Sequence, residues 1–266
     1  MKPDSLKYDS MPDIIPISAF KDNYIWTLHE QQYAVVVDPG DAAPVRAWLD
    51  ANQSVLCAIL CTHHHNDHTG GICELAEVYN VPVYGPQQET IPCISHAQGE
   101  GDRIEIAEFG ITLKVLDIPG HTHGHIAYLY EDILFCGDTL FGCGCGRLFE
   151  GTPAQLHHSL QRLAQLPDTT QVYCTHEYTE ANIRFALACE PDNQQLKQRQ
   201  ADARALRAAG HPTLPSSIAL EKATNPFLRC LEPEIIRNVE RHSGNKFAAD
   251  DELAVFTALR AWKNTF

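Results

Sequence analysis

Short runs of apolar residues alternate with polar turns along the first part of the chain, a pattern typical of β-strands. Segments with apolar residues at helical spacing separate several of these runs, and a looser segment lies between residues 87 and 101. The alternation of strand and helix predicts an α/β fold. Strands are expected at residues 14–17, 24–28, 33–37, 55–61, 81–84, 104–106, 111–116, 126–130, 133–136 and 171–174, and helices at 42–51, 71–79 and 152–164.

The pattern changes near residue 178 to longer, alanine-rich helical stretches. We therefore predict two domains, an α/β domain at 1–178 and a mainly α-helical C-terminal domain at 179–266. In its last helix, Leu253, Phe256, Arg260 and Lys263 share one stripe, which places two cations beside core residues unless their side chains reach out to solvent. The helices are expected at residues 181–189, 193–209, 231–239 and 251–263, with loops between them.

The composition limits the classes of protein that fit. The chain has 266 residues, 44% of them hydrophobic, which is enough for a sizeable core. Its net charge of −14 provides no basic field for a nucleic-acid backbone. No run of about eighteen apolar residues occurs, and residues 1–5 do not resemble a signal peptide. We therefore expect a soluble, cytoplasmic protein without a membrane or nucleic-acid partner.

The ten cysteines show no disulfide-like framework and no Cys-x-x-Cys pair, so we expect reduced and mostly buried thiols. Cys143 and Cys145 are separated by one glycine. They could form a soft metal or redox site, but two small residues in a glycine-rich turn are the favoured interpretation.

Residues 62–71, with the sequence THHHNDHTGG, contain four histidines and one aspartate within six positions. They follow a predicted strand and precede a predicted helix, where α/β enzymes usually place their chemistry. Imidazole and carboxylate groups suit zinc, iron and manganese, whereas a soft thiolate site would show cysteine. A solvated polar turn or a histidine tag is disfavoured by the internal position. The stretch therefore predicts a metal site.

Further candidate ligands stand where other strands end. The sequence His121-Thr122-His123-Gly124-His125 follows one strand, and Asp138 and His176 follow two others. Asp38 also closes a strand, so it either orients a ligand histidine or caps a turn. We assign no role to the isolated His96, nor to the helical pair His157 and His158.

The candidates are too many for one tetrahedral ion and suit two. If Asp138 bridges, then His63, His65 and His121 bind one ion, and Asp67, His68 and His176 bind the other, with His64, Asn66 and His123 as spacers. Two ions lower the pKa of a shared water toward about 7, so a metal-bridging hydroxide can attack without a catalytic serine or cysteine. This chemistry fits hydrolysis of an activated acyl compound or a phosphodiester.

In this order the ligands resemble the metallo-β-lactamase superfamily, which implies an αββα sandwich. Within it the chain resembles the glyoxalase II (hydroxyacylglutathione hydrolase) family along essentially its whole length, with a C-terminal helical, substrate-binding domain. The markers are residues 22–26, 37–41, 137–141, 145–151, 176–179 and 225–229.

The resemblance implies hydrolysis of the thioester S-D-lactoylglutathione, and of related 2-hydroxyacylglutathiones, to D-lactate and glutathione in methylglyoxal detoxification. It implies two divalent ions per chain, with zinc expected and iron or manganese as alternatives, and we expect a monomer. Arg147 and Phe149 stand where some relatives have lysine and tyrosine, so the loss of one hydroxyl contact is expected. The residues implied to hold glutathione are Arg147, Phe149, Tyr178, Arg260 and Lys263.

Two rival interpretations remain. Another binuclear hydrolase of the same fold, such as a lactonase or a β-lactamase, would keep the metal ligands but not the C-terminal cations. A non-catalytic metal- or glutathione-binding module is disfavoured by the complete ligand set. The net charge argues against an RNA-processing phosphodiesterase.

Overall fold

The computed structural model describes residues 11–266. The start of the predicted first domain and the residues that bear on the signal-peptide prediction lie outside this range. Two compact units are present, one extending to Leu116 and including Tyr128–Tyr130, the other comprising Asp117–Ala127 and Glu131–Phe266. This division differs from the domain boundary at residue 178, which was proposed from the change in sequence pattern and stays a prediction. None of the helices within residues 11–266 is long and apolar enough to cross a membrane.

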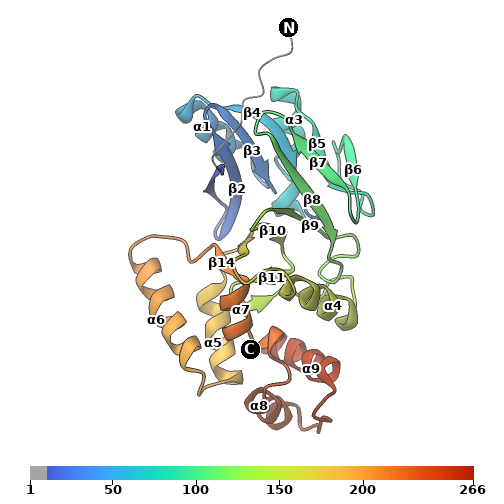
Figure 1. Ribbon diagram of the computed structural model, residues 1–266, viewed down its shortest axis with the longest axis vertical. Helices are drawn as coiled ribbons and strands as arrows, with labels where there is room; N and C mark the ends of the chain where they lie inside the picture. The colour runs from blue at the N-terminus through green and yellow to red at the C-terminus, as the bar shows by residue number, and fades with distance from the viewer. Residues whose placement is uncertain (1–10) are drawn as a thin grey trace. The chain divides into compact units, whose positions relative to one another are not determined.

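The first unit is built on a six-stranded sheet in the order β1-β2-β3-β4-β5-β6, followed along the chain by the antiparallel pair β7 and β8 (Figure 1). The strands β3 to β6 are parallel to one another, so their carboxyl ends share one edge of the sheet. The elements are β1 (Asp13–Ala19), β2 (Asn23–Glu30), β3 (Tyr33–Val37), α1 (Ala42–Asn52), β4 (Val55–Leu60), α2 (Asn66–Thr69), α3 (Ile72–Tyr79), β5 (Val83–Pro86), β6 (His96–Gln98), β7 (Arg103–Ile106) and β8 (Ile111–Asp117).

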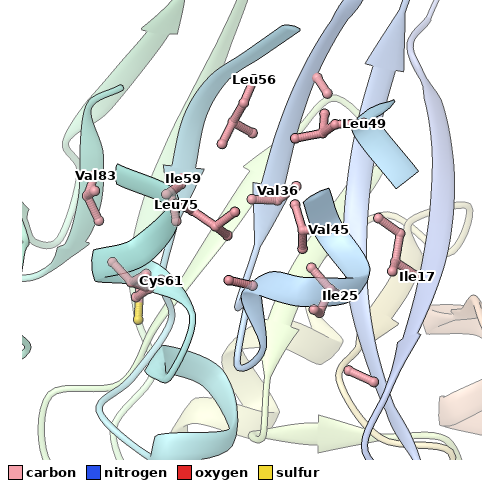
Figure 2. Packing of buried hydrophobic residues seen from close by; sticks show 14 of the residues in the cluster. Ile17, Ile25, Val36, Val45, Leu49, Leu56, Ile59, Cys61, Leu75 and Val83 are labelled. Carbon is pink, nitrogen blue, oxygen red and sulfur yellow. The ribbon is translucent and has the colours of Figure 1, made fainter. Parts of the chain in front are cut away.

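The core of this unit lies between the sheet and the helices α1 and α3 (Figure 2). Val45 and Leu49 of α1 and Leu75 of α3 are 1% exposed or less, and they pack with inward residues of the strands such as Val36 and Ile59. Burying apolar side chains from both helices stabilises the sheet and holds the turns at its carboxyl edge in place.

The second unit contains a sheet core with helices around it (Figure 1). β10 pairs in parallel with β13, so their carboxyl ends also share one edge, and β13 pairs with β14. β9 (Ile126–Tyr130) contributes residues to both units. The other elements are β10 (Ile133–Gly137), β11 (Leu140–Phe141), β12 (Gly144–Cys145), α4 (Pro153–Ala164), β13 (Gln171–Cys174), α5 (Thr179–Cys189), α6 (Gln194–Ala208), β14 (Ser216–Ser217), α7 (Ile218–Thr224), η1 (Pro226–Leu228), α8 (Pro233–Ser243) and α9 (Glu252–Thr265).

Most predicted elements are confirmed within one to four residues of their expected ends. The expectation of loop between the helices at 193–209 and 231–239 is wrong for α7, which begins where the Ser217 side chain accepts a hydrogen bond from the Leu220 amide. The loose segment after residue 87 contains β6. Leu253, expected in the core with Phe256, is 39% exposed, whereas Phe256 is fully buried.

The prediction that all cysteines are reduced is wrong for Cys73 and Cys93, which form a disulfide between α3 and the segment that leads into β6. Their separation of 20 residues follows no motif, and the sheet topology alone brings their Cα atoms to 5.4 Å. The other eight cysteines, all within residues 11–266, are free, and each is buried except the half-buried Cys57. Cys143 and Cys145 lie in the β11–β12 hairpin, which agrees with their interpretation as turn residues.

Candidate metal centre and substrate site

The loop after β4 holds the first group of candidate ligands, all within the first unit. His63 and His68 are fully buried, while His65 and Asp67 are partly exposed and Asn66 is exposed. His63 Nε2 lies 3.0 Å from His65 Nδ1, and His68 Nε2 lies 3.6 Å from Asp67 Oδ2. Ligand atoms of His63 and His68 lie within 4.8 Å of each other. Nitrogen and carboxylate donors therefore converge in this loop as the sequence predicted.

Asp38 holds this loop from the neighbouring parallel strand β3. It is 2% exposed, its Oδ1 accepts a hydrogen bond from the Thr62 amide at 2.7 Å, and its Oδ2 accepts one from the Thr62 hydroxyl at 2.7 Å. His68 Nδ1 lies 3.0 Å from Asp38 Oδ2. A carboxylate at this distance favours a proton on Nδ1, so the lone pair of Nε2 is the one that can bind a metal.

The loop approaches the end of β3 so closely that it requires glycine. A Cβ on Gly40 would lie 1.9 Å from the Asp67 carbonyl oxygen, and one on Gly70 would lie 2.5 Å from the Gly40 carbonyl oxygen. Asn23 also donates to Asp67 Oδ2 at 3.0 Å and orients that carboxylate. These contacts explain why a loop rich in polar groups keeps a single geometry.

The second unit holds the remaining candidate ligands around one carboxylate. Asp138 follows β10 and His176 follows β13, at the shared edge of these parallel strands. The Asp138 Oδ2 atom lies 3.5 Å from His121 Nε2 and 3.4 Å from His176 Nε2. All three residues are at most 6% exposed. His121 Nδ1 lies 2.7 Å from the Arg147 carbonyl oxygen and therefore carries the proton, so Nε2 is the nitrogen whose lone pair can bind a metal.

His125, which the sequence analysis left without a role, is fully buried, and its Nε2 accepts a hydrogen bond from the Asp138 amide at 3.1 Å. It therefore fixes the backbone of Asp138. The repeated His-x-His-x-His spacing was the only signal of this role, and it does not tell a ligand from a support. His96, which was given no role, is exposed, and so is His123, which was assigned as a spacer.

The donor set of both units suits a divalent ion. Buried imidazole nitrogens and carboxylate oxygens dominate it, and the two imidazoles discussed above, His68 and His121, present Nε2 because Nδ1 is hydrogen-bonded. Neutral imidazole with a fixed tautomer and an ionised carboxylate are the forms that zinc, iron and manganese bind. The residues present therefore fit a metal ion, and thiols are not part of the group.

Three predicted glutathione contacts lie near the ligands of the second unit. Arg147 and Phe149 are exposed, and the Arg147 guanidinium lies 5.7 Å from the Phe149 ring centroid. The Phe149 ring meets His121 edge-on at 5.3 Å. Tyr178 stacks on His176 at 4.6 Å between centroids, with 36% of its surface exposed. Accessible cationic and aromatic groups thus surround His121 and His176.

The two cations of α9 are less accessible. Arg260 is 6% exposed, lies over the Phe227 ring, and donates through Nη1 to the Cys145 carbonyl oxygen at 2.9 Å. Lys263 is half-buried, with Nζ 5.0 Å from the Phe185 ring centroid. Burial, together with the charges of Arg260 and Arg184, lowers the pKa of Lys263. Their predicted role in holding glutathione stays a prediction.

Comparison with known proteins finds a matching family for each of two consecutive parts of the chain. Residues 23–176 match the family described as the metallo-beta-lactamase superfamily, and residues 177–266 match the family described as the hydroxyacylglutathione hydrolase C-terminus. Hydroxyacylglutathione hydrolases of Nitrosomonas europaea and Nitrosomonas eutropha are 53% and 54% identical to it. Each alignment covers 96% of this chain, and 97% and 100% of the relatives respectively.

Solved structures show the same fold. The structure of ETHE1 from Myxococcus xanthus superposes with a TM-score of 0.64 at 26% identity, covering 96% of this chain and 100% of that one. The B3 metallo-beta-lactamase BLEG-1 gives a TM-score of 0.61 at 25% identity, covering 82% of this chain and 99% of that one. The αββα fold expected from the sequence is thereby confirmed.

Proposed function

Because this chain belongs to the hydroxyacylglutathione hydrolases of the metallo-β-lactamase superfamily, we infer that it is a metal-dependent thioesterase that hydrolyses S-D-lactoylglutathione to D-lactate and glutathione. The observation that carries this inference is the full-length match, in which the C-terminal family region accompanies the metal-binding region. A shared metal-binding fold alone would leave the substrate open. The reaction is the second step of methylglyoxal detoxification.

The chain binds divalent metal, and we propose two ions per chain, with zinc as the expected metal and iron or manganese as alternatives. His63, His65, His121 and Asp138 would hold one ion, and Asp67, His68, His176 and Asp138 the other. Support comes from the imidazole and carboxylate donors of each unit and from the position of Asp138 Oδ2 beside two histidines. When bound, the ions supply Lewis acidity that activates water and polarises the thioester carbonyl.

The residues of the chain supply position and charge. Asp38 keeps His68 in the tautomer that binds metal, and the Arg147 carbonyl does the same for His121. Glutathione carries two carboxylates, so the guanidinium of Arg147 is suited to bind one of them. Phe149 and Tyr178 offer exposed aromatic faces beside the ligands. The thiol of glutathione has a pKa of about 8.5, so its thiolate is a good leaving group and no general acid is required.

Turnover of S-D-lactoylglutathione, compared with a lactone and a β-lactam on the same preparation, tests the function. We expect the thioester to be hydrolysed with a kcat/KM at least about 100-fold above the other two, since only the thioester engages the glutathione-binding residues. Equal or greater turnover of the lactone or β-lactam would favour the rival hydrolase. Metal binding without turnover of any of the three would favour a non-catalytic module.

We also propose a cytoplasmic monomer without a nucleic-acid or membrane partner. The net charge of −14 argues against nucleic acid, and each candidate ligand comes from the same chain. Light scattering during gel filtration would test the monomer, and a mass near twice 29.6 kDa would contradict it.

A further inference from the structure

The β11–β12 hairpin connects two functional positions of the second unit. Asp138 precedes the hairpin by two residues, and Arg147 follows it by two. The hairpin turn needs unusual backbone geometry, since Cys143 has a positive φ of 58°, which is costly for a residue other than glycine. Surrounding contacts must therefore hold the turn in place.

Side chains from the C-terminal helices supply these contacts. Glu221 Oε2 accepts a hydrogen bond from the Cys143 amide at 2.8 Å, and Asn225 donates to the Gly144 carbonyl oxygen at 2.8 Å. Asn182 donates to the Gly142 carbonyl oxygen at 3.1 Å. The hairpin also packs closely against Asn182, because a Cβ on Gly144 would lie 2.5 Å from Asn182 Nδ2. The backbone of the turn is thus bound on several sides.

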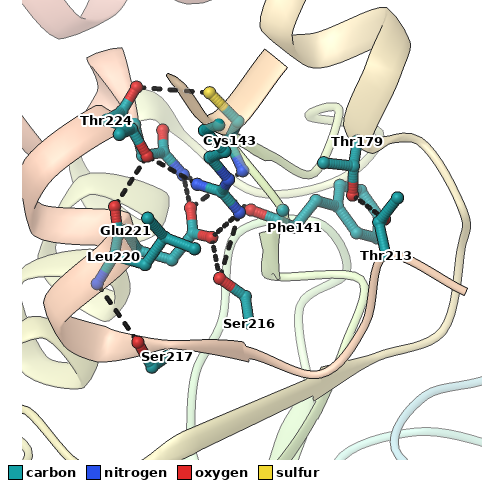
Figure 3. A network of polar contacts seen from close by, with 12 residues as sticks. Phe141, Cys143, Thr179, Thr213, Ser216, Ser217, Leu220, Glu221 and Thr224 are labelled. Atoms are coloured by element: carbon teal, nitrogen blue, oxygen red, sulfur yellow. Dashed lines mark hydrogen bonds and ion pairs between the residues drawn. The ribbon is translucent and has the colours of Figure 1, made fainter. Parts of the chain in front are cut away.

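Glu221 is the centre of this arrangement (Figure 3). Its side chain is fully buried, and each of its two carboxylate oxygens accepts two hydrogen bonds. Oε2 receives the Cys143 amide and the Asn225 side chain, while Oε1 receives Arg199 Nη2 and the Ser216 hydroxyl. Arg199 is 6% exposed, and it also donates to the Thr224 hydroxyl at 2.6 Å. The desolvation cost of a buried ion pair can cancel its attraction, so a gain in stability alone does not explain this one.

The opposite end of the segment, at Asp138, has further contacts of its own, and the Gly146 amide beside Arg147 donates to the Thr139 carbonyl oxygen at 3.1 Å. The Asp138 amide donates to His125, and the Thr139 amide donates to the Cys136 carbonyl oxygen at 3.1 Å. A shift of the turn would move Arg147, whose guanidinium is exposed and whose carbonyl oxygen lies 2.7 Å from His121 Nδ1.

We propose that Glu221, paired with Arg199, is a positioning residue that fixes the β11–β12 hairpin and so places Arg147 for the substrate carboxylate. This rests on the proposed function, because it takes Arg147 as a glutathione contact. The C-terminal helices α6 and α7 would then act on substrate affinity without touching the substrate.

Glu221→Gln is the sharpest perturbation. All four partners of the carboxylate donate, and a carboxamide replaces one accepting oxygen with a donating NH2 group, so one pair of donors loses its acceptor. We expect KM for S-D-lactoylglutathione to rise about tenfold, with kcat changing less than about threefold, because a ground-state contact to a charged group is misplaced. Because the Arg147 carbonyl oxygen also orients His121, KM and kcat are compared at equal metal content, measured on the same samples.

Glu190→Gln is the matched control. Glu190 is also 6% exposed and forms an ion pair with Arg229 at 2.7 Å in the same unit, and its side chain further accepts a hydrogen bond from Asn193. This variant loses a Glu–Arg pair away from the hairpin, in which Arg229 is partly exposed, so KM should stay within about twofold of wild type. An equal rise of KM in both variants would overturn the proposal, since general destabilisation would then explain it.

A double-mutant cycle with Arg147→Ala tests the route of the effect. If Glu221 acts through Arg147, the double variant should have a KM within about twofold of Arg147→Ala alone. If instead the increase in KM of the double variant equals the product of the two single-variant increases, the proposal is overturned. If Glu221→Gln does not fold, Asn225→Ser removes the contacts with Gly144 and with Glu221 Oε2 but leaves the Glu221–Arg199 pair, and the same cycle applies. An inactive wild type would refute the proposed function, whereas an active wild type with an unchanged KM in the variants would refute only the positioning role.

Discussion

Replacing Asp38 by asparagine tests how the first unit prepares His68 for metal. Asp38 has a positive φ of 53°, a conformation that asparagine tolerates well, so the substitution changes the side chain with little backbone strain. The Thr62 amide needs an acceptor, which places the new carbonyl oxygen at the position of Oδ1. The new NH2 group then replaces Oδ2 and faces His68 Nδ1.

Replacing the Oδ2 acceptor by an NH2 donor disfavours the His68 tautomer that binds metal through Nε2. With a donor at 3.0 Å, Nδ1 of His68 is favoured as the acceptor, and the ring proton moves to Nε2, where the metal would bind. Loss of such an orienting carboxylate typically weakens metal affinity by about 10- to 100-fold. This corresponds to about 1.4–2.7 kcal/mol of binding free energy. We expect the Asp38→Asn variant to lose first whichever of the two ions it binds less tightly.

Chelator competition measures this directly, by titrating metal-free protein with zinc against an indicator of known affinity and by recording thioesterase activity at each point. Asp102→Asn is the control, since its exposed carboxylate accepts a hydrogen bond from the Gly99 amide and the charge change is the same. Zinc affinity of Asp38→Asn within about twofold of the control would refute the reasoning, because the tautomer would then not depend on Asp38.

Three further predictions concern α9 and the disulfide. Arg260→Ala or Lys263→Ala should each raise KM for S-D-lactoylglutathione more than it lowers kcat, and steady-state kinetics showing mainly a kcat effect would contradict the assignment. Burial lowers the pKa of Lys263 from 10.5, so this lysine loses its charge at a lower pH than an ordinary lysine does. KM should therefore rise with pH below 10.5 in the wild type but not in Lys263→Arg. Parallel profiles of KM against pH in the two proteins would contradict this. Replacing Cys73 and Cys93 by serine should lower the free energy of unfolding by about 3 kcal/mol in urea titrations, and unchanged stability would argue against the disulfide in solution.

Both the fold and the candidate ligands could be predicted from the sequence, because both depend on where the buried strands lie and where they end. Strands buried on a sheet face read as short apolar runs, and the parallel strands β3 and β4, like β10 and β13, bring their carboxyl ends to one edge. Asp38 and His68, which are 30 residues apart, could therefore be expected to meet. The resemblance to a known family then supplied the substrate, which no periodicity indicates.

Contacts between distant side chains could not be predicted in this way. Glu221 binds the amide of Cys143 from 78 positions away, and Arg199 lies 22 positions before Glu221. Neither interval has a spacing rule, because the partners meet only when separate helices pack on the hairpin. The same limit hid the disulfide and left His125 without a role. α7 was missed because it spans only seven residues, so its apolar period is too short to stand out.

The most direct test of the account is thioesterase activity and metal content measured on one sample. We expect purified protein to contain about two divalent ions per chain, to hydrolyse S-D-lactoylglutathione, to lose that activity on chelation and to regain it with zinc, iron or manganese. Full activity with fewer than about 0.1 ions per chain, or no hydrolysis with two ions bound, would contradict it.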